Sequence, residues 1–168
     1  MLGSASLNFD RLQGGCEYRA EVTCRMCRQA GIPVWKAWAF RQVREDGSLG
    51  TPLIPHRQAD PATTKKFITW EFHVAAAVMV DAGALSAFAV LDPSLSSGPC
   101  TVREWAAMMD APNARVIISD ASVFLIDHKT LAFHESVGDH LVDAEMAAQA
   151  HDIDTLVPRR RPQDYRHA

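Results

Sequence analysis

The sequence predicts an α+β fold in which an N-terminal helix carrying a cysteine packs on an antiparallel sheet. Three patterns lead to this prediction. Small or apolar residues recur every three or four positions over residues 16–30, as they do on the buried face of a helix. Side chains alternate over residues 34–40 and again over 69–80, as they do in strands. A further apolar run over 85–92 then predicts a strand that returns as a hairpin.

The totals favour one catalytic domain over residues 1–168, with residues 158–168 as a frayed tail. The chain has 168 residues and 48% hydrophobic content, enough to bury a core without disulfides or a metal. Its 17 Lys+Arg and 20 Asp+Glu give a net charge of -3, which speaks against nucleic acid or an anionic membrane as a partner. The N-terminus lacks a signal-peptide pattern and no run is long enough to span a membrane. Localisation is left open between the cytoplasm and export by a leaderless route.

The predicted first helix ends where Gly31 and Pro33 interrupt the pattern. Cys24 and Cys27 form a CxxC pair inside it, without the second pair of ligands that a zinc site needs. We therefore interpret these two cysteines as packing residues and expect neither a metal nor a cofactor.

The next elements are strands separated by one long polar segment. Residues 34–40 predict a central strand, and residues 44–66 a long loop of the kind that often has a function. In the strand predicted over 69–80, Trp70 lies on one face and His73 on the other. The returning strand ends at Asp92, because Pro93 cannot donate a hydrogen bond to a ladder.

The second half of the chain is predicted to contain one short helix, two strands and a final helix. Thr101 and Glu104 form a capping box at the start of a helix over 101–109, and Cys100 precedes it in a loop. Strands are expected over 114–119 and 122–127, and a helix over 141–156.

The hairpin decides whether His73 and Asp92 can meet. A tight turn at Ala82–Gly83 places His73 directly opposite Asp92, with Cβ atoms about 4.5–5.5 Å apart. A carboxylate at that distance can accept a hydrogen bond from the imidazole. Ala82 is a poor residue for the positive φ of a two-residue turn, so a longer loop would change the register.

Cys16 would complete a nucleophilic site with this pair. It follows two glycines at the start of the first helix, where free backbone N–H groups favour a thiolate and can stabilise an oxyanion. Gly15 has no side chain, so a substrate carbonyl can come close. Each residue also has a structural interpretation: Cys16 as a small core residue, His73 as a satisfied buried group, and Asp92 as a turn former.

Three stretches resemble, in order and spacing, the protein-glutaminase family of bacterial protein-glutamine deamidases, which have a papain-like or transglutaminase-like core. They are GCEYRAEVTCRMCRQAGI (residues 15–32), WEFHVA (70–75) and LDPSLSSGPCTVREW (91–105). The resemblance spans residues 14–109. It implies that Cys16 is the nucleophile, His73 the general base, and Asp92 the carboxylate that orients His73.

The resemblance also implies a reaction and a substrate. Cys16 attacks the side-chain amide of a glutamine in a protein or peptide, ammonia leaves, and water hydrolyses the thioester to glutamate. Gly15, Trp70, Ser94 and Trp38 are candidate substrate-binding residues. Gln13 is a candidate second oxyanion donor. The sequence does not identify a dedicated target or inhibitor protein.

Other functions use the same three residue types. Release of the acyl group by an amine would make the chain a transglutaminase or an N-acyltransferase, and attack on a backbone amide would make it a cysteine peptidase. A non-catalytic papain-like binding module with a buried Cys16 is the alternative outside enzymes.

Overall fold

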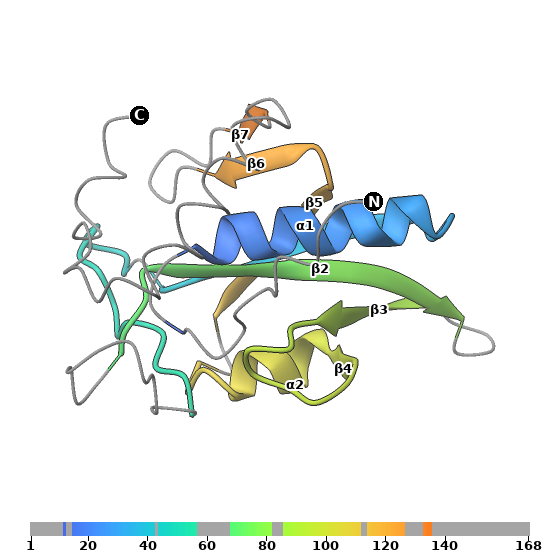
Figure 1. Cartoon of the computed structure of the whole chain (residues 1–168). Helices are drawn as coiled ribbons and strands as arrows, with labels where there is room; N and C mark the ends of the chain where they lie inside the picture. The colour runs from blue at the N-terminus through green and yellow to red at the C-terminus, as the bar shows by residue number, and fades with distance from the viewer. Residues whose placement is uncertain are drawn as a thin grey trace, which may run out of the picture.

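The computed structural model describes residues 12, 15–42, 44–56, 68–81, 86–111, 114–126 and 133–135. Its elements follow the order α1, β1, β2, β3, β4, α2, β5, β6 and β7 (Figure 1). Helix α1 spans Cys16–Gln29 and begins after Gly15, whose φ of 69° lies in the left-handed region. It ends at Ala30 and Gly31, and the φ of 73° at Gly31 turns the chain toward the sheet. The predicted first helix is confirmed.

An antiparallel five-stranded sheet forms the centre of the domain. It contains β1 (Val34–Phe40), β2 (Phe72–Asp81), β3 (Ser86–Leu91), β4 (Cys100–Thr101) and β5 (Arg115–Asp120). The spatial order is β4-β3-β2-β1-β5, so the two longest strands, β1 and β2, are both internal. The predicted α+β class and the central position of residues 34–40 are both confirmed.

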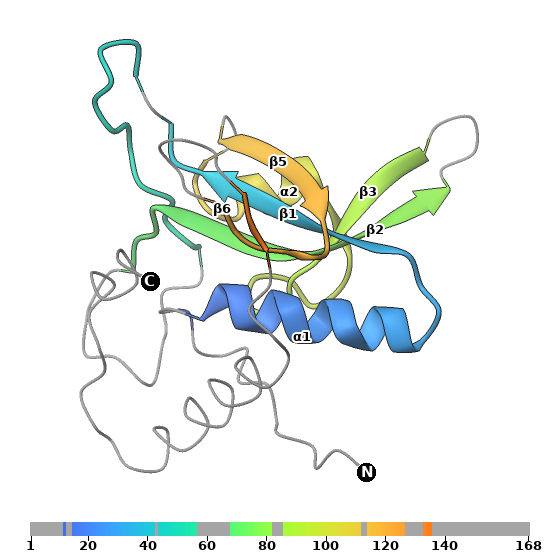
Figure 2. The ribbon, with the colours of Figure 1, turned by 90° about the horizontal axis from the view of Figure 1, so that it is seen from above.

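The two helices cover opposite faces of this sheet (Figures 1 and 2). On one face α1 packs its small side chains against alternate residues of β1 and β2, namely Trp38, Phe40, Val74 and Ala76. On the other face Trp105 of α2 (Val102–Ala107) packs against the intervening residues, Ala37, Ala39, Ala75 and Ala77. The alternation of strand side chains thus builds two hydrophobic layers with the sheet between them.

Helix α2 begins where the capping box predicted. The Thr101 hydroxyl accepts from the backbone N–H of Glu104, and the Glu104 carboxylate accepts from the backbone N–H of Thr101. Strands β6 (Val123–Ile126) and β7 (Phe133–Glu135) form a separate two-stranded sheet. Strand β6 lies near α1, where the rings of Tyr18 and Phe124 meet edge to face with centroids 5.1 Å apart.

Several boundaries differ from the sequence predictions. Strand β2 starts at Phe72 rather than Thr69, because Trp70 forms an isolated bridge with Leu53 instead. Cys100 is not a loop residue: it is buried in β4 opposite Val90. The predicted helix over 141–156 and the tail over 158–168 lie outside the described residues.

The described part of the long polar loop, residues 44–56, is anchored to its neighbours. The backbone N–H groups of Ile54 and His56 donate to the carbonyls of Met109 and Met108, at 2.8 and 2.7 Å. This loop therefore runs beside the end of α2 and against the approach to β2. Among the described elements, no helix is long and apolar enough to cross a membrane.

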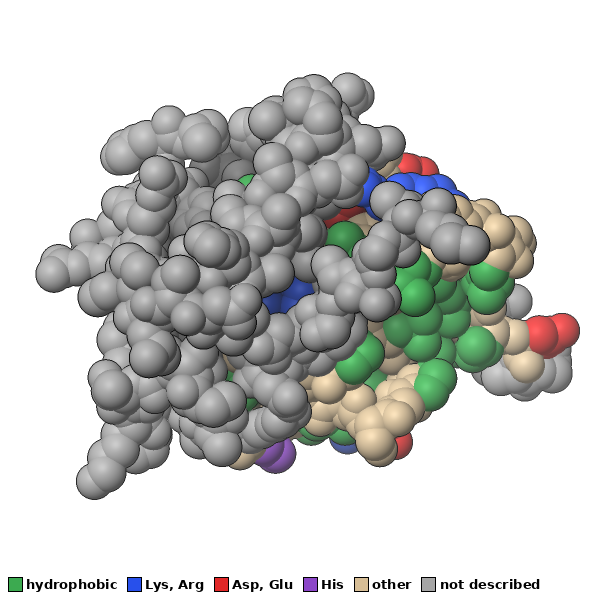
Figure 3. Space-filling view, in the orientation of Figure 1, with side chains coloured by type: hydrophobic (Ala, Val, Ile, Leu, Met, Phe, Trp, Pro, Cys, Tyr) green, Lys and Arg blue, Asp and Glu red, His purple; other side chains and the backbone are tan. Residues whose placement is uncertain are grey.

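Hydrophobic side chains also gather on part of the surface. In the view of Figure 3 they lie below α1, over β2 and β3. Met79 and Val80, at the far end of β2, are among the large hydrophobic residues that are exposed.

Candidate active site

His73 and Asp92 are joined by a hydrogen bond of 2.8 Å between Nε2 and Oδ2, and both side chains are buried. The predicted register is nevertheless wrong. Strands β2 and β3 pair Asp81 with Ser86 and Ala76 with Leu91, so four residues rather than two lie between the paired ends. The shift is two residues relative to the prediction. Since side chains alternate with a period of two, a shift of two leaves His73 and Asp92 on the same face.

Asp92 accepts hydrogen bonds at both carboxylate oxygens. Oδ2 accepts from His73 and from Trp105 Nε1, each at 2.8 Å. Oδ1 accepts from the backbone N–H of Ser94 at 3.1 Å and from the Ser94 hydroxyl. Burial alone would raise the pKa of Asp92, but the His73 charge and these hydrogen bonds outweigh it and hold that pKa well below its usual range. The carboxylate is therefore kept ionised and fixed in place.

The His73 imidazole contacts two tryptophan rings. Trp70 stacks on it with ring centroids 4.2 Å apart and planes 10° from parallel. The Trp105 ring is tilted by 34° to the imidazole, with centroids 5.8 Å apart. Trp70 also donates from Nε1 to the carbonyl of Leu12 at 2.9 Å, which ties the ring to the chain that leads into α1. With Nε2 committed to Asp92, His73 Nδ1 has no hydrogen-bond partner among the described residues.

Cys16 is the first residue of α1 and lies beside the strand that carries His73. The ladder between β2 and β3 ends at Ala76, and beyond that end the backbone of Val74 is hydrogen-bonded to Cys16. The Cys16 thiol donates to Glu17 Oε2 at 3.5 Å, and no hydrogen bond joins it to His73.

The surroundings of Cys16 oppose the thiolate that a helix start favours. Cys16 is only 9% exposed. Burial, and secondarily the charge of Glu17, raise the pKa of the Cys16 thiol well above its ordinary value, although Arg19 and the Val74 backbone oppose the rise. This direction favours the thiol over the thiolate at Cys16.

The four candidate substrate-binding residues have different environments. Gly15 precedes α1 and its carbonyl accepts from Arg19 N–H at 3.1 Å. Trp38 is fully buried and donates to Ser119 Oγ at 2.9 Å, so it is a core residue rather than a cleft wall. Ser94 is likewise buried and its hydroxyl is bound to Asp92, so it holds the carboxylate. Trp70 stacks on His73. The alternation of strand side chains had predicted these two residues on opposite faces.

Sequence reasoning did not assign Trp105 or Glu17. The capping box fixed the start of α2, but nothing in the sequence showed that Trp105, in the first turn, would reach Asp92. Glu17 directly follows Cys16, and this adjacency could have pointed to a contact between them. Adjacent helix residues usually point apart, however. Gln13 lies outside the described residues.

A surface pocket of about 160 Å³ lies apart from these groups. It is lined by residues 40–42 and 51–53 together with Asp110, Ala111 and Ala114. In the described part of the chain, no cluster of three or more His, Cys, Asp or Glu side chains could hold a metal ion.

Comparison with known proteins identifies solved structures with a similar fold and a family model that matches the chain. A crystal structure of protein-glutaminase superposes with a TM-score of 0.64 at 17% identity, covering 92% of this chain and 76% of that one. The NMR structure of protein-glutaminase from Chryseobacterium proteolyticum also superposes with a TM-score of 0.64 at 17% identity, covering 90% of this chain and 75% of that one. A crystal structure of pro-protein-glutaminase superposes with a TM-score of 0.66 at 16% identity, covering 88% of this chain and 49% of that one. No curated protein sequence matches the chain.

The fold thus belongs to the α+β class that the protein-glutaminase structures represent. A family model described as glutaminase matches residues 4–109, which is more than half of the 168 residues. The chain belongs to this glutaminase family and is an amidohydrolase, as the resemblance of the three stretches implied.

Proposed function

We propose that this glutaminase deamidates glutamine side chains of proteins or peptides, with Cys16 as nucleophile, His73 as general base and acid, and Asp92 as the group that orients His73. The observation that carries the proposal is the buried 2.8 Å hydrogen bond between His73 Nε2 and Asp92 Oδ2. It fixes the imidazole and leaves Nδ1 available. The Val74 backbone, one residue after His73, is hydrogen-bonded to Cys16.

The first half of the reaction forms a thioester. Because the Cys16 pKa is raised, His73 takes the thiol proton as the sulfur attacks the γ-carbon of the glutamine amide. The imidazolium that results is stabilised by the ionised Asp92. The free backbone N–H groups that the start of a helix supplies can stabilise the oxyanion that develops. His73 then returns the proton to the nitrogen, and ammonia leaves.

The second half hydrolyses the thioester. His73 removes a proton from a water molecule that attacks the same carbon, and the carbon–sulfur bond breaks. The sulfur regains its proton and the glutamine has become glutamate. Each group is thereby restored, so the cycle requires no cofactor.

A protein substrate is supported by the neighbouring structures, whose names state protein-glutaminase. The test is to incubate the chain with casein and measure ammonia together with peptide masses, with and without a primary amine. Deamidation predicts one ammonia for each new glutamate. Incorporation of the amine would instead show a transglutaminase or N-acyltransferase, and new N-termini would show a peptidase. Absence of all three products would favour a binding module.

A further inference from the structure

Glu17 is a half-buried carboxylate placed beside the proposed nucleophile. Its Oε2 lies 3.5 Å from Cys16 Sγ, and within the described part of the chain this thiol is the only hydrogen-bond partner of Glu17. A carboxylate is an unfavourable neighbour for a sulfur that must become negatively charged, since it opposes the thiolate. Arg19 acts in the opposite sense on the same sulfur, but less strongly than Glu17. The position of Glu17 therefore makes ionisation of the Cys16 thiol less favourable.

A deamidase faces a problem that such a charge can solve. Its substrate and product side chains, a carboxamide and a carboxylate, have nearly the same size and shape. A pocket that recognises shape alone cannot strongly distinguish them. They differ in charge and in hydrogen bonding, because the amide is neutral with two N–H donors, whereas the carboxylate is negative and only accepts.

We propose that Glu17 makes the site prefer a carboxamide over a carboxylate: it accepts a hydrogen bond from the substrate NH₂ group and repels the glutamate product. The inference rests on the proposed function, because attack by Cys16 brings the γ-carbon to about 3–3.5 Å from the sulfur. The nitrogen bonded to that carbon then comes within reach of a carboxylate that is itself 3.5 Å from the sulfur.

The same contact explains how one side chain serves both ends of the cycle. During the attack, the thiol proton passes to His73, and the Glu17 oxygen that accepted from the thiol becomes free to accept from the amide. After hydrolysis, two carboxylates lie close together in a partly buried site, where like charges repel more strongly than in water. Charge repulsion therefore favours release of the product.

The test compares two capped peptides that differ only in one glutamine or glutamate, bound to the Cys16→Ala variant so that neither is turned over. The binding constants are measured by NMR titration at millimolar peptide and low salt. We expect the glutamine peptide to bind at least about tenfold more tightly. In Cys16→Ala/Glu17→Gln that preference should fall to near unity, mainly because the glutamate peptide binds better.

Glu45→Gln on the same background is the matched control, because Glu45 is exposed in the loop over residues 44–56 and its loss changes the net charge equally. It should leave the preference unchanged. If Glu17→Gln fails to fold, Glu17→Ala tests the same charge with a good helix former.

Three results would overturn the inference: equal binding of the two peptides to Cys16→Ala, a preference that survives loss of Glu17, or binding of neither peptide. The proposed function fails on a different result, namely deamidation by Cys16→Ala. The two can therefore be separated.

Discussion

The imidazole of His73 and the carboxylate of Asp92 form a buried pair, with Nε2 and Oδ2 2.8 Å apart at the end of the β2–β3 ladder. Asp92 lies one residue beyond the last residue of β3, where the chain is no longer held by the ladder. Its position is set instead by Ser94 and Trp105. The pair is thus built from a strand on one side and a loop with a short helix on the other.

This pair predicts a graded response to substitution. Asp92→Asn keeps a hydrogen-bonding group but removes the charge and permits the wrong tautomer of His73, so kcat should fall by roughly 10²–10⁴-fold. His73→Ala removes the base altogether and should lower kcat further. Ammonia release from casein measures both. Equal losses, or a larger loss in Asp92→Asn, would contradict the assigned roles.

Trp105→Phe removes the indole N–H that binds Asp92 Oδ2 while it keeps an aromatic ring. We expect a loss of about 1–3 kcal/mol in the free energy of unfolding, because a hydrogen bond to a buried charge is lost. We also expect kcat to fall several-fold while KM stays unchanged, since Trp105 acts through Asp92. Urea denaturation and steady-state kinetics give the two values.

Trp35→Phe is the control for this change. Trp35 is half-buried and meets Phe88 with ring centroids 5.4 Å apart, so it also lies in the core but does not contact Asp92. Its kcat should remain that of the parent protein. If both variants lowered kcat alike, Trp105 would be a packing residue only.

The lowered pKa of Asp92 predicts a pH dependence of stability. A carboxyl whose pKa is lower in the folded protein than the unfolded value of about 3.9 stabilises the fold above that value, and the contribution disappears as pH falls toward the folded pKa. Between about pH 5 and pH 3, the parent protein should therefore lose more unfolding free energy than Asp92→Asn. Parallel curves from urea titrations at each pH would show that the Asp92 pKa is not lowered by folding.

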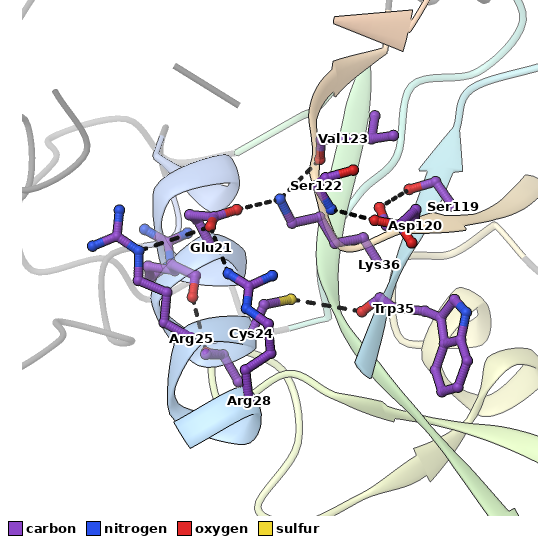
Figure 4. A network of polar contacts seen from close by, with 12 residues as sticks. Glu21, Cys24, Arg25, Arg28, Trp35, Lys36, Ser119, Asp120, Ser122 and Val123 are labelled. Atoms are coloured by element: carbon purple, nitrogen blue, oxygen red, sulfur yellow. Dashed lines mark hydrogen bonds and ion pairs between the residues drawn. The ribbon is translucent and has the colours of Figure 1, made fainter. Parts of the chain in front are cut away.

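A buried ion pair between Glu21 and Lys36 joins α1 to β1 (Figure 4). Lys36 Nζ lies 2.5 Å from Glu21 Oε2 and also donates to the Val123 carbonyl at 2.8 Å. Lys36→Met leaves a buried carboxylate without its closest cation and should cost about 3–5 kcal/mol in urea unfolding.

Arg28→Gln is the matched control for Lys36→Met. Arg28 contacts the same carboxylate at 3.1 Å, but its side chain is 46% exposed. Loss of this contact should cost at most about 1 kcal/mol. If the two variants cost the same, the buried pair would not hold α1 against the sheet.

The layers of the fold follow from local patterns, which is why the sequence was sufficient to predict them. The helical period from Cys16, the alternation around Trp38 and the capping box at Thr101 each predicted an element that the structure contains. These patterns depend on neighbours within one turn or one strand. The Asp92–Pro93 end of β3 was predicted for the same reason.

What the sequence could not predict depends on long-range contacts. The alternation of side chains predicted Trp70 and His73 on opposite faces of one strand, and this prediction was wrong. Leu53, from the long loop, pairs with Trp70, so β2 does not start at that residue. The hairpin register depended on a loop length that Ala82 and Gly83 left open. The raised pKa of Cys16 comes from burial by the whole fold, which no pattern around residue 16 contains.

The most direct measurement of the central claim is ammonia release from casein by Cys16→Ala beside the parent protein. Removal of one small side chain at the start of α1 should leave the fold intact, which circular dichroism and the unfolding midpoint verify. We predict that the folded variant releases no ammonia above the uncatalysed rate. A folded Cys16→Ala protein that deamidates casein at the parent rate would contradict the account.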